Sequence, residues 1–334
     1  MTTCRPVWTL ALPKGTTLRP SRQEEGARTY GVTVDVVVVA NPTKFDDLPS
    51  AQRWLAARVQ ALGHEAPRWY LTTLEDPGTE LSRRAAEAGA DLVLSWGGDG
   101  TTRAAAEGVA HTDTSLGILP GGTGNLLARN LGVPLDLAEA LNVAYGQHQR
   151  RIDMMDVSMG RGVHHKSLVM CGIGWDALMM DVSERTKARF GWGAYAFQAL
   201  RTVRDHPIRL RVRVDDGEEF TFYGRTCLIA NVGSLVGGLT LLPESHPDDG
   251  LLEVLVFDPT TSVDYLRTSW GLLRGATNSA DPSRTLIRGK KAVVTTHRPR
   301  PRQIDGDLVD DGYGFVVRME PAALSVKAPR SIDD

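Results

Sequence analysis

Residues 97–101 read Gly-Gly-Asp-Gly-Thr and lie between a short apolar run, residues 91–95, and a run typical of a helix start, residues 102–107. The apolar run predicts a buried strand. Glycines at a strand-to-helix turn let the backbone approach a phosphate group closely and point N–H groups at it. The carboxylate of Asp99 suits a cation, or the orientation of donors around one. A tight connection without any ligand is the alternative for such a turn.

A second glycine-rich stretch strengthens the ligand-binding interpretation. Residues 119–125 read Leu-Pro-Gly-Gly-Thr-Gly-Asn, follow an apolar run at 115–118 and precede a predicted helix at 126–131. Two loops of the phosphate-binding type at neighbouring strand ends describe a nucleotide-binding crevice.

The first part of the chain alternates between strand and helix patterns. The further elements expected there are strands at 32–40 and 68–72 and helices at 47–62 and 81–88. This alternation predicts a parallel sheet with helices on both faces. Ligands of such sheets bind beyond the carboxyl ends of the strands. Residues 41–44, Thr72 and both glycine loops fall at those ends.

The pattern changes after residue 150, where strand-like runs predominate and residues 210–214 alternate between apolar and charged. Such alternation is typical of an antiparallel sheet with one solvated face. We therefore expect a mobile leader at 1–30, an α/β nucleotide-binding domain at 31–150, a β-rich domain at 151–312, and a segment at 313–330 that returns to the first domain.

Composition limits the classes of function. A net charge of -2 over 334 residues argues against a nucleic-acid-binding protein, which usually carries a basic footprint. The three cysteines lie far apart and predict neither disulfides nor a zinc site, which favours a reducing compartment. No apolar run approaches the roughly 20 residues of a membrane-spanning helix. We expect a cytoplasmic protein whose membrane contact, if any, is peripheral.

The ordered set of motifs resembles the diacylglycerol kinase catalytic-domain family of lipid kinases, which includes bacterial diacylglycerol kinases and sphingosine kinases. The resemblance spans roughly residues 33–327 and rests on residues 41–42, 97–101, 122–125 with Ala128, 172–177, 190–191 with 194–195, 248–251 and 305–307. It implies an N-terminal domain like that of NAD kinases and phosphofructokinases, followed by a mostly antiparallel β-sandwich.

The resemblance also implies transfer of a phosphoryl group from ATP, with Mg²⁺, to a hydroxyl group of diacylglycerol or a related lipid. The residues that it assigns to the nucleotide are Asn41, Pro42, Thr43, Lys44, Thr72, Gly97, Gly98, Asp99, Gly100, Thr101, Gly122, Thr123 and Asn125. For several of these a simpler interpretation exists: Asn-Pro is a common turn signal, Lys44 suits a solvated loop end, and Thr72 suits an edge strand.

Asp305 is the candidate proton acceptor, and Asp307 follows two residues later across a glycine. In an extended chain, side chains two apart share one side, so one carboxylate can take a proton while the other helps to hold metal. An ordinary surface turn is the alternative, because Asp-Gly is a strong turn signal. The family usually has Glu at position 307, so the reach of that side chain is shorter here.

Two further assignments concern residues outside the glycine loops and the Asp305 turn: a metal site and a membrane-contact segment. The resemblance places a structural Mg²⁺ at Asp249, which Asp99 could join through water; an ordinary turn is the alternative. The basic, aromatic segment that contains Arg189, Trp192 and Tyr195 fits either contact with an anionic membrane surface or a solvated face beside a core helix.

Two other functions are compatible with the sequence: a kinase for a soluble hydroxylated substrate such as NAD, and a nucleotide or lipid sensor without catalysis. Exposed strand edges in the β-rich domain also leave room for a homodimer.

Overall fold

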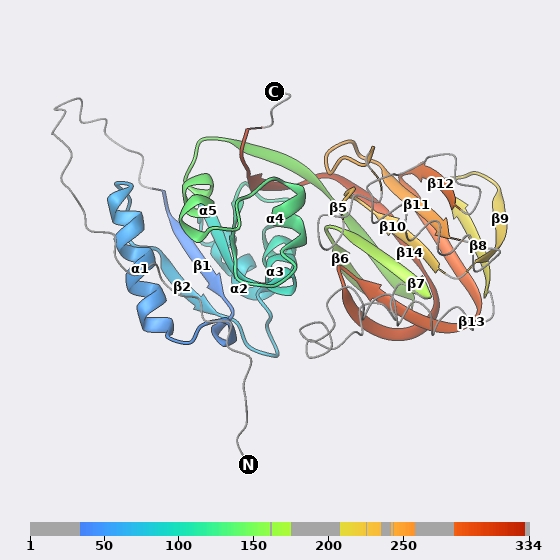
Figure 1. Cartoon of the computed structure of the whole chain (residues 1–334), viewed down its shortest axis with the longest axis horizontal. Helices are drawn as coiled ribbons and strands as arrows, with labels where there is room; N and C mark the ends of the chain where they lie inside the picture. The colour runs from blue at the N-terminus through green and yellow to red at the C-terminus, as the bar shows by residue number, and fades with distance from the viewer. Residues whose placement is uncertain are drawn as a thin grey trace, which may run out of the picture.

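The computed structural model describes residues 34–160, 162–174, 208–224, 226–234, 242, 244–257 and 284–330. The expected leader at 1–30 and the candidate lipid-contact residues Arg189, Trp192 and Tyr195 lie outside these ranges. Two layered parts lie side by side: an α/β part and a β-sandwich (Figure 1). This confirms the fold class that the sequence predicts.

The α/β part contains a parallel sheet in the order β2-β1-β3-β4. Its elements are β1 (Val36–Ala40), η1 (Pro42–Lys44), α1 (Leu48–Ala61), β2 (Arg68–Leu71), α2 (Thr79–Glu87), β3 (Leu92–Gly97), α3 (Asp99–Val109), β4 (Ser115–Pro120), α4 (Leu126–Asn130) and α5 (Leu137–Ala144). Every residue of β1, β3 and β4 is buried, as expected for strands covered on both faces.

Local sequence explains where these helices begin. The side chain of Asp47 accepts a hydrogen bond from the Ser50 N–H and caps α1, and Asp136 caps α5 in the same way. Asp76 accepts the N–H groups of Gly78, Glu80 and Leu81 at the start of α2. The start of α3 differs, because Gly98 at its N-cap offers no side chain. Its first N–H groups therefore face the carboxyl edge of the sheet without a side-chain cap from that position.

The β-sandwich is built mainly from antiparallel strands around a second core. Its strands are β5 (Gln149–Gly160), β6 (Val163–Ser167), β7 (Met170–Gly174), β8 (Ile208–Val214), β9 (Glu219–Gly224), β10 (Thr226–Ala230), β11 (Leu252–Phe257), β12 (Arg284–Gly289), β13 (Lys291–Ile304) and β14 (Asp307–Lys327). In β8, apolar side chains face the core and Arg209, Arg211 and Arg213 face outward. The alternation predicted from residues 210–214 is thus present.

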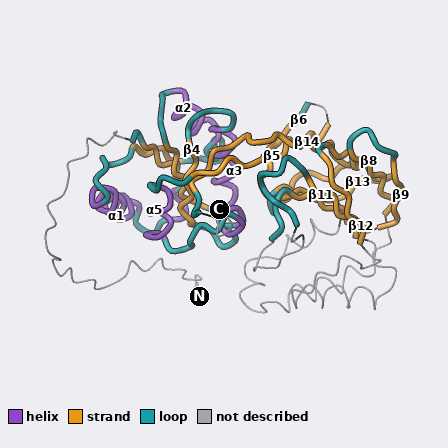
Figure 2. Tube along the Cα trace, turned by 90° about the horizontal axis from the view of Figure 1, so that it is seen from above, coloured by secondary structure: helices purple, strands orange, loops and turns teal. Residues whose placement is uncertain are grey.

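Two long strands, β5 and β14, run from one part to the other (Figures 1 and 2). In β5, Ile152 and Met154 pack in the core of the α/β part, whereas Met155 and Val157 pack in that of the sandwich. β14 pairs with β5 along both parts and, near its end, lies parallel to β4. The boundaries expected after residues 150 and 312 therefore fall inside continuous strands.

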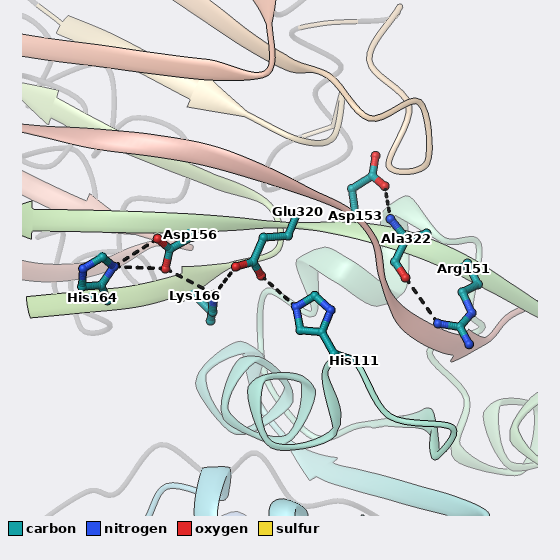
Figure 3. A network of polar contacts seen from close by, with 8 residues as sticks. All are labelled: His111, Arg151, Asp153, Asp156, His164, Lys166, Glu320 and Ala322. Atoms are coloured by element: carbon teal, nitrogen blue, oxygen red, sulfur yellow. Dashed lines mark hydrogen bonds and ion pairs between the residues drawn. The ribbon is translucent and has the colours of Figure 1, made fainter. Parts of the chain in front are cut away.

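A row of polar contacts lies at the junction of the two parts (Figure 3). Glu320 on β14 contacts His111, which follows α3, at 3.2 Å, and Lys166 on β6 at 2.6 Å. The Lys166 ammonium also reaches Asp156 on β5 at 3.2 Å, and His164 lies 3.0 Å from the same carboxylate. Backbone pairing reinforces this link, because the His111 N–H donates to the carbonyl of residue 323.

Candidate nucleotide and phosphate site

The carboxyl ends of the parallel strands meet at one edge of the sheet. There the Asn41 N–H donates to the Trp96 carbonyl at 3.1 Å, and the Gly121 N–H donates to the Gly97 carbonyl at 2.8 Å. The Thr72 N–H donates to the last residue of β1 at 2.9 Å. The loops expected to line a nucleotide are therefore neighbours in space, although they come from four separate strands.

Asp99 joins the two glycine loops. Its carboxylate accepts the N–H of Asn125 at 2.9 Å and that of Leu126 at 2.5 Å, at the start of α4. Burial raises the pKa of Asp99 above its ordinary value; the two hydrogen bonds oppose this shift, and the charges of Asp305 and Asp307 add to it. Because both of its oxygens already accept N–H groups, Asp99 acts first as a clamp between the loops.

The glycines of these loops fall into two groups. A Cβ on Gly122 would lie 2.7 Å from the Gly98 Cα, and one on Gly124 would lie 2.6 Å from an Asp99 carboxylate oxygen, so packing within the protein requires both glycines. In contrast, a Cβ on Gly98 or Gly100 would meet no protein atom closer than 3.6 Å. A Cβ at either position would make only ordinary van der Waals contact, so packing within the protein does not itself require glycine there. A bare backbone at such a turn is what a phosphate cradle requires.

Asn125 and Thr123 have different positions in the second loop. Asn125 has a left-handed backbone with φ 47°, and its side chain accepts the Gly122 N–H and donates to the Gly122 carbonyl. It therefore shapes the loop. Thr123 is exposed at the loop tip, whereas Thr101 of the first loop is buried against Gly97. Of these side chains, the Thr123 hydroxyl is the one that faces solvent.

The residues that follow β1 and β2 have similarly distinct roles. The Asn41 side chain accepts hydrogen bonds from the Thr43 N–H at 3.0 Å and the Thr43 hydroxyl at 2.8 Å, which caps the short helix η1 at Pro42. Lys44 is exposed at the end of that helix, and Thr72 is buried. Among these, Lys44 carries a charge that can reach a bound anion.

Asp305 lies in the turn between β13 and β14, buried against the loop that connects β6 and β7. Its carboxylate accepts four hydrogen bonds, from the Ser167 hydroxyl at 2.7 Å and from the N–H groups of residues 168, 169 and 170 at 2.9–3.0 Å. One oxygen, Oδ1, takes three of these bonds and Oδ2 takes one. A left-handed backbone at Asp305, with φ 49°, and the following Gly306 reverse the chain.

Asp307 faces the first glycine loop. Its side chain is 57% exposed, and its Oδ2 would lie 3.6 Å from a Cβ on Gly100. The Arg103 guanidinium on α3 donates to the same oxygen at 2.8 Å and to the carbonyl of Ile304 at 2.7 Å. The turn at residues 304–307, hereafter the acidic turn, therefore lies beside the N-terminus of α3.

Asp249 belongs to a different cluster. Its carboxylate accepts the Leu251 N–H at 2.9 Å and contacts the Arg288 guanidinium at 2.7 Å, while Asp248 contacts Arg150 at 2.5 Å. Its charge adds to the raised pKa of Asp153. Within the described ranges, no group of three or more His, Cys, Asp or Glu side chains is arranged to hold a metal ion. Asp99 and Asp249 thus lie in separate clusters.

Sequence reasoning did not single out the partners of the acidic turn. Arg103 stands 204 residues before Asp307, and Ser167 stands 138 residues before Asp305. The one local signal is spacing: Arg103 follows Gly100 by three positions, so both lie on one face of α3.

Comparison with known proteins identifies the family of the chain. The model of the diacylglycerol kinase catalytic domain matches residues 35–157, and that of the YegS C-terminal NAD kinase beta sandwich-like domain matches residues 169–328. A Chromohalobacter salexigens protein named probable lipid kinase YegS-like is 32% identical over 86% of this chain and 91% of its own length. The chain belongs to the diacylglycerol kinase catalytic-domain family.

Further matches are to proteins named diacylglycerol kinase. The Mycobacterium tuberculosis H37Rv diacylglycerol kinase is 29% identical over 75% of this chain and 81% of its own. A solved diacylglycerol kinase structure from Bacillus anthracis str. Sterne has a TM-score of 0.66 at 19% identity, covering 89% of this chain and 97% of its own, which shows a shared fold. The family resemblance inferred from the motifs is confirmed, and the protein is a kinase of this family. Among the described helices, none is both long and apolar enough to cross a bilayer.

Proposed function

We propose that this protein is an ATP- and Mg²⁺-dependent kinase that transfers the γ-phosphoryl group to a hydroxyl group of diacylglycerol or a related lipid. The observation that carries the proposal is the position of the acidic turn beside the first glycine loop, where the Asp307 carboxylate lies against Gly100 and contacts Arg103. Phosphoryl transfer needs a phosphate cradle, cationic neutralisation and an acceptor for the hydroxyl proton, all within reach of one another. The neighbouring loops supply candidates for each.

The phosphate groups would lie over Gly98 and beside the Asp307 carboxylate at Gly100, where a Cβ would make only ordinary van der Waals contacts. The first N–H groups of α3 point to this edge and carry the partial positive charge of the helix terminus. Thr123 and Lys44, both exposed, would extend the binding surface from the neighbouring loops. The Asp99 clamp keeps the two loops in register without itself contacting the phosphates.

Bound Mg²⁺ would neutralise phosphate charge and bring oxygen ligands into a fixed geometry. The chain offers one carboxylate ligand for such an ion beside the glycine loop. The exposed Asp307 carboxylate supplies the hard oxygen donors that Mg²⁺ prefers. Proteins typically hold Mg²⁺ with one or two carboxylates plus substrate phosphates and water. A structural ion at Asp249, whose carboxylate contacts Arg288 at 2.7 Å, is a separate proposal.

Asp305 is our candidate for the group that takes the proton of the lipid hydroxyl. A carboxylate oxygen has two acceptor positions, and Asp305 Oδ2 uses one of them, for the Leu168 N–H. The other hydrogen bonds, on Oδ1, fix the orientation of the carboxylate. The lipid itself would reach the site from a membrane surface, with the protein bound peripherally and without a nucleic-acid partner.

The test is transfer from γ-labelled ATP to lipids in mixed micelles: diacylglycerol, sphingosine, ceramide, monoacylglycerol and undecaprenol, with NAD as a soluble acceptor. Wild type is compared with Asp305→Asn and Asp307→Asn. We expect transfer to a lipid that both substitutions reduce at least about a hundredfold, the usual scale of acid–base and electrostatic contributions.

Asp305→Asn places an amide NH₂ group where N–H donors already converge, so its folding is checked by circular dichroism. Asp307→Asn, at an exposed side chain, keeps the test valid if the first variant unfolds. Transfer to NAD alone would show a soluble-substrate kinase. Tight ATP binding without transfer to any acceptor would show a sensor.

A further inference from the structure

Arg103 is the residue through which α3 contacts the acidic turn. It follows Gly100 by three positions, and helical side chains lean toward the N-terminus, so its guanidinium lies over the first turn of α3. One terminal nitrogen, Nη1, donates to the Ile304 carbonyl at 2.7 Å, and the other, Nη2, donates to Asp307 Oδ2 at 2.8 Å. The side chain is 23% exposed, so its charge is partly shielded from water.

These two contacts do different things. The bond to the Ile304 carbonyl fixes the backbone at the start of the turn, and the bond to Asp307 fixes the direction of its side chain. A planar guanidinium can make both at once, whereas an ammonium group is a single point of contact. Together, the two hydrogen bonds of Arg103 determine where the Asp307 carboxylate lies relative to Gly100.

The charge of Arg103 also matters at this place. The charges of Asp305 and Asp307 both add to the raised pKa of Asp99, so three carboxylates lie near the proposed polyphosphate site. Arg103 contributes a positive charge in direct contact with Asp307. Without it, the acidic turn would be repelled by Asp99 and by any bound phosphate.

We propose that Arg103 is a positioning residue that ties the acidic turn to the glycine loop and holds Asp307 over Gly100, so that nucleotide binding and the acidic turn are coupled. This inference rests on the proposed function for its catalytic consequence. The physical coupling between Arg103 and Asp307 is measurable without any lipid.

The experiment compares wild type with Arg103→Met, Arg103→Lys, Asp307→Asn and the double variant Arg103→Met/Asp307→Asn. The matched control is Arg83→Met, which removes an exposed guanidinium that contacts Glu80 on α2. Three quantities are measured: the Kd of Mg-ATP by calorimetry, kcat and KM with the lipid acceptor, and the midpoint of urea unfolding.

We expect Arg103→Met and Asp307→Asn each to raise the Kd of Mg-ATP about tenfold, and the double variant to raise it no further than either alone, because the two residues act as one unit. The kcat falls while the KM for lipid stays within about twofold of wild type. Arg103→Lys restores part of the ATP affinity, because the charge remains, but not kcat, because one ammonium cannot replace both bonds. Arg83→Met matches wild type throughout.

Multiplicative losses of affinity in the double variant would overturn the proposal, as would an Arg103→Met protein that matches Arg83→Met. A loss of affinity explained entirely by a lower unfolding midpoint would also overturn it. If wild type transfers phosphate to no lipid, the proposed function fails, and the non-additive Kd values alone support or reject the positioning role. If wild type binds no Mg-ATP, both fail.

Discussion

The carboxylate of Asp99 accepts the backbone N–H of Asn125 at 2.9 Å, across 26 residues of chain. This bond joins the two glycine loops, so the acidic residue of the first loop defines the shape of the second. The other carboxylate oxygen of Asp99 accepts the N–H of Leu126, so both oxygens accept backbone hydrogen bonds.

Replacement of Asp99 by Asn should therefore loosen both loops. One amide end would present NH₂ to a backbone N–H, and a buried donor without an acceptor costs about 1–3 kcal/mol. We expect Asp99→Asn to lower the free energy of urea unfolding by about that amount and to weaken Mg-ATP binding. Asp113→Asn, at a fully exposed side chain, is the control. Unchanged stability in Asp99→Asn would contradict the clamp role.

Alanine at two glycines of the loops should separate ligand space from protein packing. Gly98→Ala places its Cβ 3.7 Å from the nearest protein atom, so we expect a loss of stability below about 1 kcal/mol but a clear rise in the Kd of Mg-ATP. Gly122→Ala places its Cβ 2.7 Å from the Gly98 Cα and should destabilise the fold by about 1–3 kcal/mol. Wild-type ATP affinity in a well-folded Gly98→Ala protein would exclude the phosphate cradle proposed here.

The glycine loops could be predicted from the sequence because the signals are local. A buried strand, a glycine turn and a helix start follow one another within about a dozen residues at 91–102, and parallel sheets bring such turns to one edge. The environment of the acidic turn could not be predicted in this way. The four donors to Asp305 come from residues 167–170, far away in the chain.

The hydrogen bonds to Asp305 also bear on where strand β7 begins. The apolar run at 168–171 predicts a strand over its whole length, but β7 begins at Met170. The N–H groups of Leu168 and Val169 donate to the Asp305 carboxylate, so this stretch wraps around the acidic turn before the strand begins. β5 is one continuous strand, although Asp153 and Asp156 interrupt its apolar pattern where it passes from one core to the other.

The buried Asp153 should make stability depend on pH. Its carboxylate accepts the N–H groups of Gly250 at 2.6 Å and Ala322 at 2.7 Å. Burial raises the pKa of Asp153 above its ordinary value of 3.8; the two hydrogen bonds oppose this, and the charges of Asp249 and Asp248 raise it further. The folded protein therefore holds this proton more tightly than the unfolded chain does.

This difference in proton affinity determines how the free energy of unfolding changes with pH. The contribution of Asp153 is fully present below pH 3.8 and is lost as pH rises through the raised pKa of the folded state. In urea unfolding from pH 4 upward, in steps of about half a unit, the wild-type free energy should fall more steeply with pH than that of Asp153→Asn. Asp311→Asn controls for the loss of one exposed charge. Parallel curves for wild type and Asp153→Asn would contradict this prediction.

Lys166 should contribute more to stability than an ordinary surface lysine, because it stands between two partly buried carboxylates at the junction. The side chains of Lys166, Asp156 and Glu320 are 21%, 15% and 27% exposed. Burial alone lowers the pKa of Lys166, but the hydrogen bonds and charges of Glu320 and Asp156 outweigh it and raise the pKa, so the ammonium stays charged.

Lys166→Met would leave these two carboxylates close together without their shared cation. Exposed pairs contribute about 0–1 kcal/mol and breaking a buried pair costs about 3–5 kcal/mol, so we expect a loss of about 1–3 kcal/mol for this intermediate case. Arg83→Met, at an exposed ion pair, should lose less than about 0.5 kcal/mol. Adding Glu320→Gln to Lys166→Met should recover part of the loss, because it removes one of the two repelling charges. Urea unfolding measures all four proteins, and a double variant less stable than Lys166→Met would show that the carboxylates do not repel one another across the junction.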